Sequence, residues 1–159
     1  MKQFFTLLLF LFVVSISAQD KTFKDFYKSH KKTADVSLNV PGFIARWFVE
    51  DNDDEEINEL LAKARNYKIM VFDNNSTSIQ KDLKKFVKAN NLKTLVKVKD
   101  RKDRISIHFK EDKNLIREII VNVYSEDDDE SVLLGLRTKL TKKEFASVVK
   151  PMKAKVASK

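Results

Sequence analysis

The sequence predicts an α+β fold, in which an antiparallel sheet is covered on one face by helices. In the first half of the 159-residue chain, apolar residues recur three and four positions apart, as they do on amphipathic helices. From residue 92 onward they recur at every second position, as in half-buried strands. Helical patterns cluster early and strand patterns cluster late, so the sheet is expected to combine a C-terminal four-strand meander with two earlier strands.

The first helix is expected over residues 21–31, because three aromatic side chains share one face and lysines occupy the other. The aromatic residues are Phe23, Phe26 and Tyr27. A strand is expected over residues 35–40, which Pro41 and Gly42 end. Its alternating apolar residues are Val36, Leu38 and Val40. A short, largely buried helix is expected over residues 42–49, with Phe43, Ile44, Trp47 and Phe48 as its apolar side chains.

Two further helices flank a buried strand at residues 67–72. The first follows the acidic stretch 50–56, whose carboxylates suit a helix N-terminus. Its inward residues are Ile57, Leu60, Leu61 and Ala64. The second is expected over residues 79–89 after a polar turn, and it has the cleanest division into two faces. Ile79, Leu83, Phe86 and Val87 point inward, and Lys81, Lys84, Lys85 and Lys88 point outward.

The four strands of the meander are separated by charged turns. The first hairpin has Thr94, Val96 and Val98 on one arm and Ile105, Ile107 and Phe109 on the other. The remaining strands are expected at residues 115–124 and 132–138, joined by the acidic loop 126–130. Thr141 and Glu144 form a capping box that opens the last helix. Its inward residues are Phe145, Val148, Val149 and Met152, and residues 151–159 are expected to be a frayed basic tail.

Residues 1–18 have the pattern of a cleavable export signal. Lys2 precedes an apolar run that is too short to span a bilayer, and Ala18 supplies the small residue before a cleavage site at Gln19. We therefore expect a single exported domain over residues 19–159, soluble in the periplasm or outside the cell, with no transmembrane segment after cleavage. The chain has no cysteine, so it can form no disulfide and no acylated lipoprotein anchor.

Several classes of chemistry are disfavoured by the residues that the chain lacks. No cysteine nucleophile exists, and the two glycines, Gly42 and Gly135, are too far apart for a phosphate-binding loop. His30 and His108 have no companion at metal-ligand spacing and are interpreted as surface histidines. The acidic stretch 50–56 lacks the glycine of a calcium loop, so a solvated helix start is the favoured interpretation. No cofactor or metal is expected.

The net charge of +8 comes mainly from lysine, which favours solubility more than specific recognition. The lysine stripe formed by Lys81, Lys84, Lys85 and Lys88 is the candidate surface for an anionic partner. The simpler interpretation, a solvated helix face, is favoured. Aromatic residues fall on predicted core faces and leave no stacking platform, so no specific nucleic acid is expected.

Several segments that together extend over nearly all of residues 19–159 resemble a family of small exported Bacteroidota proteins of unknown function. The resemblance rests on Phe23-x-x-Phe26, Val36-x-Leu38-x-Val40 and the aromatic helix expected after it, the hairpin segment 96–100 and the helix 141–149. It is a pattern of core positions and turns without a catalytic signature, so it implies no site residue. Many members of this family look like lipoproteins, whereas this chain lacks the acylated cysteine.

Three hypotheses for function remain open. The leading one is a non-enzymatic exported module that binds an envelope protein or an anionic envelope component. The second is a hydrolase that uses carboxylates such as Asp73, which follows a predicted strand. The third is a structural or stress-regulated envelope protein. A concave pocket with perturbed titratable groups is the feature that would distinguish them.

Overall fold

The computed structural model describes residues 22–44, 58, 62–74 and 76–157, with side chains described as far as residue 150. The helices with defined bounds are α2 (Phe23–His30), α5 (Ser76–Ala89) and α6 (Lys142–Ala157), and the described residues 42–44, 58 and 62–63 are also helical. The strands are β1 (Val36–Pro41), β2 (Asn66–Phe72), β3 (Lys93–Asp100), β4 (Asp103–Asp112), β5 (Leu115–Ser125) and β6 (Glu130–Thr141). None of the helices in these ranges combines the length and the apolar character needed to cross a membrane.

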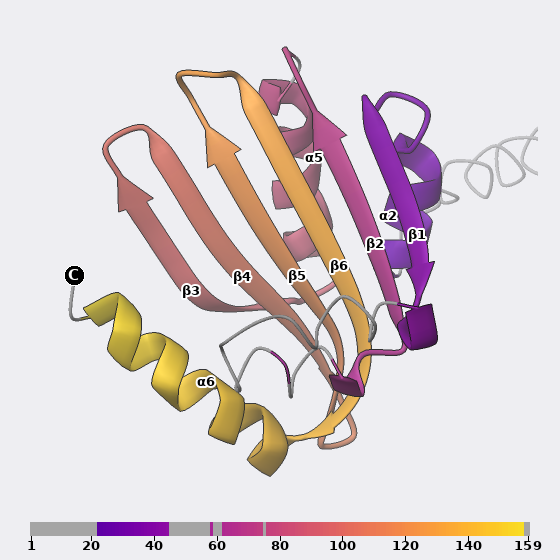
Figure 1. Ribbon diagram of the computed structural model, residues 1–159, viewed down its shortest axis with the longest axis vertical. Coiled ribbons are helices and arrows are strands. Elements are labelled where there is room, and N and C mark those ends of the chain that lie inside the picture. The colour runs from indigo at the N-terminus through magenta and orange to yellow at the C-terminus, as the bar shows by residue number, and fades with distance from the viewer. Residues whose placement is uncertain (1–21, 45–57, 59–61, 75, 158–159) are drawn as a thin grey trace, which may run out of the picture.

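The six strands form one antiparallel sheet in the order β1-β2-β6-β5-β4-β3 (Figure 1). The meander from β3 to β6 is present as predicted, and the two earlier strands join it beside its last strand. The edge strands are β1, which ends at Pro41, and β3, which has a bulge between Thr94 and Val96. Proline, lysines and a bulge make such edges poor templates for further strands.

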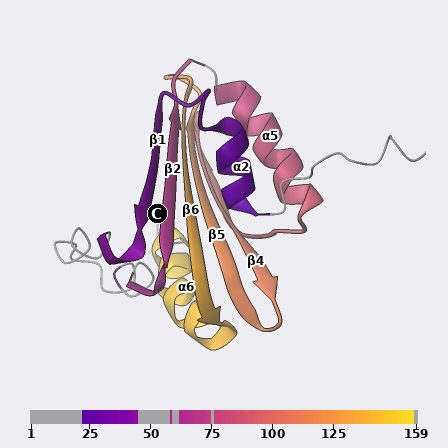
Figure 2. The same cartoon turned by 90° about the vertical axis from the view of Figure 1, so that its right-hand side faces the viewer.

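Helices lie on both faces of the sheet (Figure 2). α2 and α5 cover one face with a core that includes Phe26, Leu83 and Met70. α6 packs on the opposite face, where Phe145 and Val149 meet strand residues. The α+β class and the antiparallel sheet are confirmed. The position of α6 differs from the expectation that helices cover a single face, because β5 and β6 carry apolar residues on both sides.

α2 sits close to the sheet because glycine occupies the strand position beneath it. A Cβ atom at Gly135 would lie 1.9 Å from Cδ1 of Phe23. Phe23, Phe26 and Tyr27 are buried, as their spacing predicts. A capping box between Thr22 and Asp25 begins the helix. The close approach therefore places the N-terminus of α2 directly against β6 and its neighbours.

Polar side chains lie beneath α5 as well as apolar ones. The Gln80 amide donates to Asn122 Oδ1 at 2.8 Å and to Ser131 Oγ at 2.9 Å. His108 lies at hydrogen-bond distance from the hydroxyls of Thr94 and Ser106. The prediction of His108 as a surface histidine is therefore wrong: it is half-buried, and burial lowers its pKa.

His30 also makes more contacts than a solvated histidine. Its ring stacks on Phe26 with 4.2 Å between ring centroids. Its Nε2 atom lies 3.4 Å from Oδ2 of Asp82, so it connects α2 to α5. The predicted role as an ordinary surface histidine is corrected to a contact between two helices.

Some expected elements differ or lie outside the described residues. Phe43 is 65% exposed and not buried as predicted. The backbone before it is fixed at Gly42, whose N–H donates to the Arg65 carbonyl at 3.0 Å and whose added Cβ would lie 2.5 Å from the Ala64 carbonyl oxygen. α5 begins at Ser76, earlier than predicted, and α6 continues through Pro151 to Ala157 where a frayed tail is predicted. Ala64 is buried as expected. The expectations for Trp47, Phe48, Ile57, Leu60, Leu61 and the acidic stretch 50–56 lie outside the described residues.

Candidate functional site

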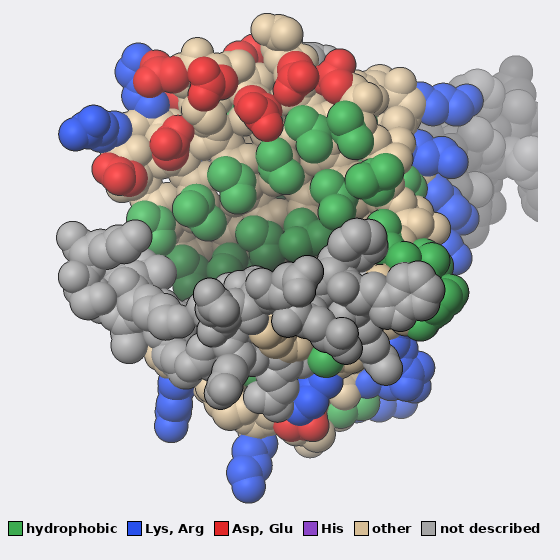
Figure 3. Space-filling model, viewed as in Figure 1, with side chains coloured by type: hydrophobic (Ala, Val, Ile, Leu, Met, Phe, Trp, Pro, Cys, Tyr) green, Lys and Arg blue, Asp and Glu red, His purple; other side chains and the backbone are tan. Residues whose placement is uncertain are grey.

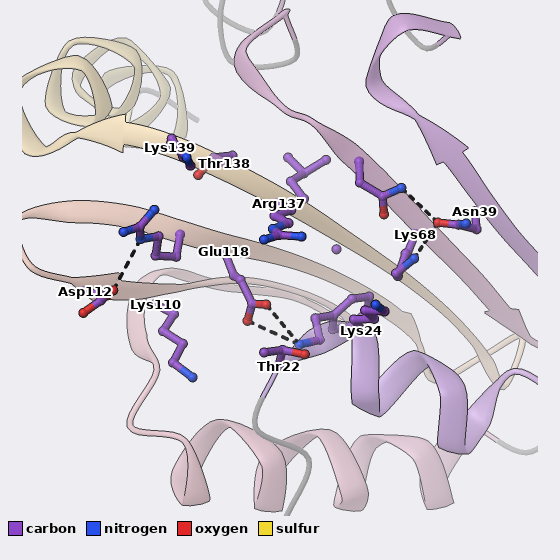
Figure 4. A pocket seen from close by; sticks show the side chains of 15 residues that line it. Thr22, Lys24, Asn39, Lys68, Lys110, Asp112, Glu118, Arg137, Thr138 and Lys139 are labelled. Atoms are coloured by element: carbon purple, nitrogen blue, oxygen red, sulfur yellow. Dashed lines mark hydrogen bonds and ion pairs between the residues drawn. The ribbon is translucent and has the colours of Figure 1, made fainter.

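A pocket of about 750 Å³ opens on the α2 face of the sheet, beside the N-terminus of that helix (Figure 4). Strands β1, β2, β4, β5 and β6 and the first turn of α2 all contribute to its lining. A volume of this size suits a small ligand. Its charged lining residues are Lys24, Lys68, Lys110, Arg117, Arg137, Lys139, Asp112 and Glu118.

Cross-strand pairing aligns the charged floor of the pocket. Arg137 on β6 pairs with Glu118 on β5, and Glu118 pairs with Lys110 on β4. Asn66 on β2 extends the same row on the other side of Arg137. Directly opposed residues on one face have neighbouring side chains. The register of three strand pairs therefore brings together groups that are distant in the sequence.

Glu118 is the buried acidic group of the pocket, with 8% of the residue exposed. Both of its carboxylate oxygens accept from the Phe23 backbone N–H, at 3.3 Å each. Figure 4 shows this side chain pointing toward the first turn of α2. Burial raises the pKa of Glu118 above its usual value, although the Phe23 hydrogen bond and the charges of Lys110 and Arg137 act in the opposite direction.

Three backbone N–H groups at the start of α2, those of Thr22, Phe23 and Asp25, already have acceptors. Glu118 binds that of Phe23, and Asp25 Oδ2 accepts from the Thr22 N–H at 3.2 Å. The Asp25 N–H donates to Thr22 Oγ1. Most of the donors that remain for a ligand in the pocket are therefore side-chain cations.

Lys68 lies among other cations at one side of the pocket. Burial lowers its pKa, and the nearby ammonium groups of Lys24, Lys28 and Lys31 lower it further. The Lys68 ammonium donates to Asn39 Oδ1 and lies 4.9 Å from the centre of the Tyr27 ring. Neither partner is negatively charged, so the positive charge of this cluster is not neutralised by its contacts.

The remaining charges leave the pocket strongly positive. Arg117 pairs with Asp112, with 3.4 Å between Nε and Oδ2. In the ranges that the structure describes, Lys24, Arg137 and Lys139 have no carboxylate within ion-pair distance. Both acidic groups of the pocket are thus engaged, whereas most cations are available. Such a concave, positively charged surface concentrates anions.

The described part of the chain contains no group of three or more His, Asp or Glu side chains that could hold a metal ion. The chemistry that this pocket offers is electrostatic: lysines act as point charges, and the planar guanidinium of Arg137 can bind two oxygens at once. Phosphate and carboxylate groups match this donor set.

The predicted site residues lie elsewhere. Lys81, Lys84, Lys85 and Lys88 are exposed on α5 and do not line the pocket. Asp73 is exposed after β2, and its backbone N–H donates to Asp35 Oδ2 at 2.7 Å. Sequence reasoning missed the pocket because its residues come from six elements. The interior glycine Gly135 and the charged Glu118 beside an apolar run were the available signals.

Comparison with known proteins identifies the family. No curated protein matches the chain, and no solved structure matches it. The family described as Domain of unknown function (DUF4252) matches residues 20–148, which include the sheet, α2, α5 and the start of α6. Because this match covers most of the chain, the protein belongs to the DUF4252 family.

Proposed function

We propose that this protein is an exported, non-enzymatic binding module and that the cationic pocket holds an anionic ligand. The observation that carries the proposal is the charge of the pocket: six lysine and arginine side chains line it together with two carboxylates. Both carboxylates are already bound within the protein. The ligand class is a phosphate-bearing or carboxylate-bearing component of the cell envelope.

Export is supported by the signal pattern of residues 1–18. We expect mass spectrometry of the protein from its native host to find Gln19 at the N-terminus, without a lipid. A mature protein that keeps residues 1–18 would contradict export by cleavage at this position.

Isothermal titration with pyrophosphate and with citrate tests the pocket and separates phosphate from carboxylate recognition. We expect saturable one-to-one binding that weakens with salt, because screening reduces attraction between charges. Arg137→Gln and Lys68→Gln should each increase the dissociation constant of the preferred ligand about tenfold or more, which is the usual effect of losing one charge-assisted hydrogen bond. Glu118→Gln should strengthen binding, because it removes a negative charge from the pocket.

The lysine stripe of α5 provides a matched control. A variant with Gln at Lys81, Lys84, Lys85 and Lys88 loses four exposed cations outside the pocket. We expect it to keep pyrophosphate or citrate binding, and to lose any salt-sensitive binding to vesicles that contain an acidic lipid. Equal loss of small-anion binding in the stripe variant and in Arg137→Gln would contradict a specific pocket.

The hydrolase alternative has less support. Asp73 lies outside the pocket, and both oxygens of Glu118 accept from the Phe23 amide. A carboxylate engaged in this way caps α2 and is not free to activate water. Absence of binding to both anions would favour the third hypothesis, a structural envelope protein.

A further inference from the structure

The face of the sheet opposite the pocket carries two complete rows of apolar side chains that none of the described helices buries fully. Strand register defines the rows. The first contains Val36, Val71, Val132, Val123, Ile105 and Val98. The second contains Leu38, Ile69, Leu134, Val121, Ile107 and Val96. We call these twelve residues the open rows.

No residue of the open rows is fully buried: four are exposed and eight are half-buried. Two of the half-buried residues, Ile107 and Leu134, pack against the core cluster that includes Phe145 and Val149 of α6. Leu38 is 48% exposed, Val36 44%, Ile105 41% and Val123 39%. Figure 3 shows a band of hydrophobic side chains across this face of the molecule. The next row, with Tyr67, Ile119 and Leu136, is buried against α6. A contiguous apolar surface that the described part of the chain leaves partly uncovered is typical of an interface.

Opposite charges lie at the two ends of this face. The turns at residues 100–104 and 126–130 contain seven acidic and three basic residues, and Figure 3 shows acidic side chains along this edge. β6 runs away from the acidic end, and α6 begins where it finishes. Residues 142–157 of α6 contain five lysines and one glutamate. The same face thus has an acidic end, an apolar middle and a basic helix.

This distribution matches a second copy of the chain. A two-fold axis that is parallel to the sheet and perpendicular to the strands would pack open rows on open rows. It would also bring the acidic end of each copy to α6 of the other. The contact is self-complementary, as a two-fold interface requires. An axis along the strands would instead place the two acidic ends together, which repulsion disfavours.

The acidic end also argues against a lipid surface as the occupant. Anionic lipid headgroups would meet the acidic turns beside the open rows, and like charges repel. We propose that the open rows form the interface of a homodimer in which two sheets pack face to face, with each acidic end against the partner's α6. The pocket lies on the other face, so this proposal does not depend on the proposed function.

Sedimentation equilibrium of the chain from residue 19 onward tests the proposal. We expect dimers whose dissociation constant increases about tenfold or more in Leu38→Lys and in Val123→Lys, because each substitution places an ammonium in an apolar contact. Phe43→Lys is the matched control: Phe43 is the most exposed of the large apolar residues described, yet it lies outside the open rows. It should leave the dissociation constant unchanged.

Charge exchange tests the orientation. Asp100→Lys combined with Asp103→Lys should weaken the dimer, and Lys143→Glu combined with Lys150→Glu should do the same. A mixture of the two charge variants should associate more tightly than either alone. Circular dichroism confirms folding, and Leu38→Thr and Val123→Thr replace any lysine variant that unfolds. A wild-type chain that stays monomeric at all concentrations, or a dimer that keeps its affinity in the row variants, would overturn the proposal.

Discussion

At the scale of single residues, Gly135 decides how closely the first helix can approach the sheet. The Phe23 ring occupies the space where a side chain at position 135 would begin, and it is buried. We expect Gly135→Ala to reduce the free energy of unfolding by roughly 1–3 kcal/mol, as overpacking of a well-filled core does. Urea unfolding measures this.

A rescue experiment identifies the cause of that loss. Phe23→Ala in the Gly135→Ala background removes the ring atoms Cγ, Cδ1 and Cε1, which lie nearest to the new methyl group. The double variant should therefore lose less stability than the two single effects added together. Simple additivity would show that the contact between Phe23 and position 135 is not responsible.

Glu118 should make stability depend on pH. A carboxyl group whose pKa is raised by folding binds its proton more tightly in the folded protein. The stabilising contribution of protonated Glu118 is fully present below the pKa that this group has in the unfolded chain. It is lost as the pH rises through the higher pKa of Glu118 in the folded protein. Glu118→Gln cannot ionise, so its stability relative to wild type should increase as the pH rises above the ordinary carboxyl pKa of 4.5. Urea unfolding across this range gives the comparison, and a relative loss with rising pH would contradict it.

At the scale of elements, the capping box of α6 should make stability depend on pH in the direction opposite to that of Glu118. Thr141 donates to Glu144 through both its backbone N–H and its hydroxyl, at 2.8 Å each. These bonds, with Lys63, lower the pKa of Glu144 to about 2. A depressed carboxyl pKa stabilises the fold above the usual pKa near 4.5, and this contribution is lost as the pH falls through about 2.

Thr141→Ala removes the hydroxyl from this cap. We expect the free energy of unfolding to fall by about 1 kcal/mol at neutral pH, the usual effect of losing a threonine N-cap. The difference from wild type should shrink as the pH approaches 2, because protonated Glu144 no longer accepts these bonds as an anion. Ser147→Ala, further along the same helix, is a suitable control. If the stability difference between Thr141→Ala and wild type did not change with pH, the stabilising effect of the cap would not depend on the ionisation of Glu144, which would contradict this prediction.

At the scale of the whole molecule, charge is segregated between the faces of the sheet. Cations gather around the pocket and along the outer side of α5. The acidic turns border the open rows, where Lys102 pairs with Asp127 and Arg104 pairs with Glu126. The net charge of +8 therefore conceals two surfaces of different character. One suits anions, and the other suits an apolar partner with a basic border.

Local patterns in the sequence determined the elements. The spacing of Phe23, Phe26 and Tyr27 predicts α2, and alternation predicts the four strands of the meander. Thr141 and Glu144 are recognisable as a cap because the interaction spans only three residues. Each of these features depends on neighbours along the chain, so its physical cause can be read without the fold.

Only the tertiary structure decided which faces are covered. Alternation separates Ile105 and Ile107 from Ser106 and His108, but it does not say which set a helix will cover. In the folded protein α5 covers the face with His108, whereas Ile105 remains exposed. The pocket likewise joins residues from strands that are far apart in sequence. Such placements follow from long-range packing and strand register. The periodicity of a sequence distinguishes the two faces of a strand, but it does not specify which helix or strand packs against each face.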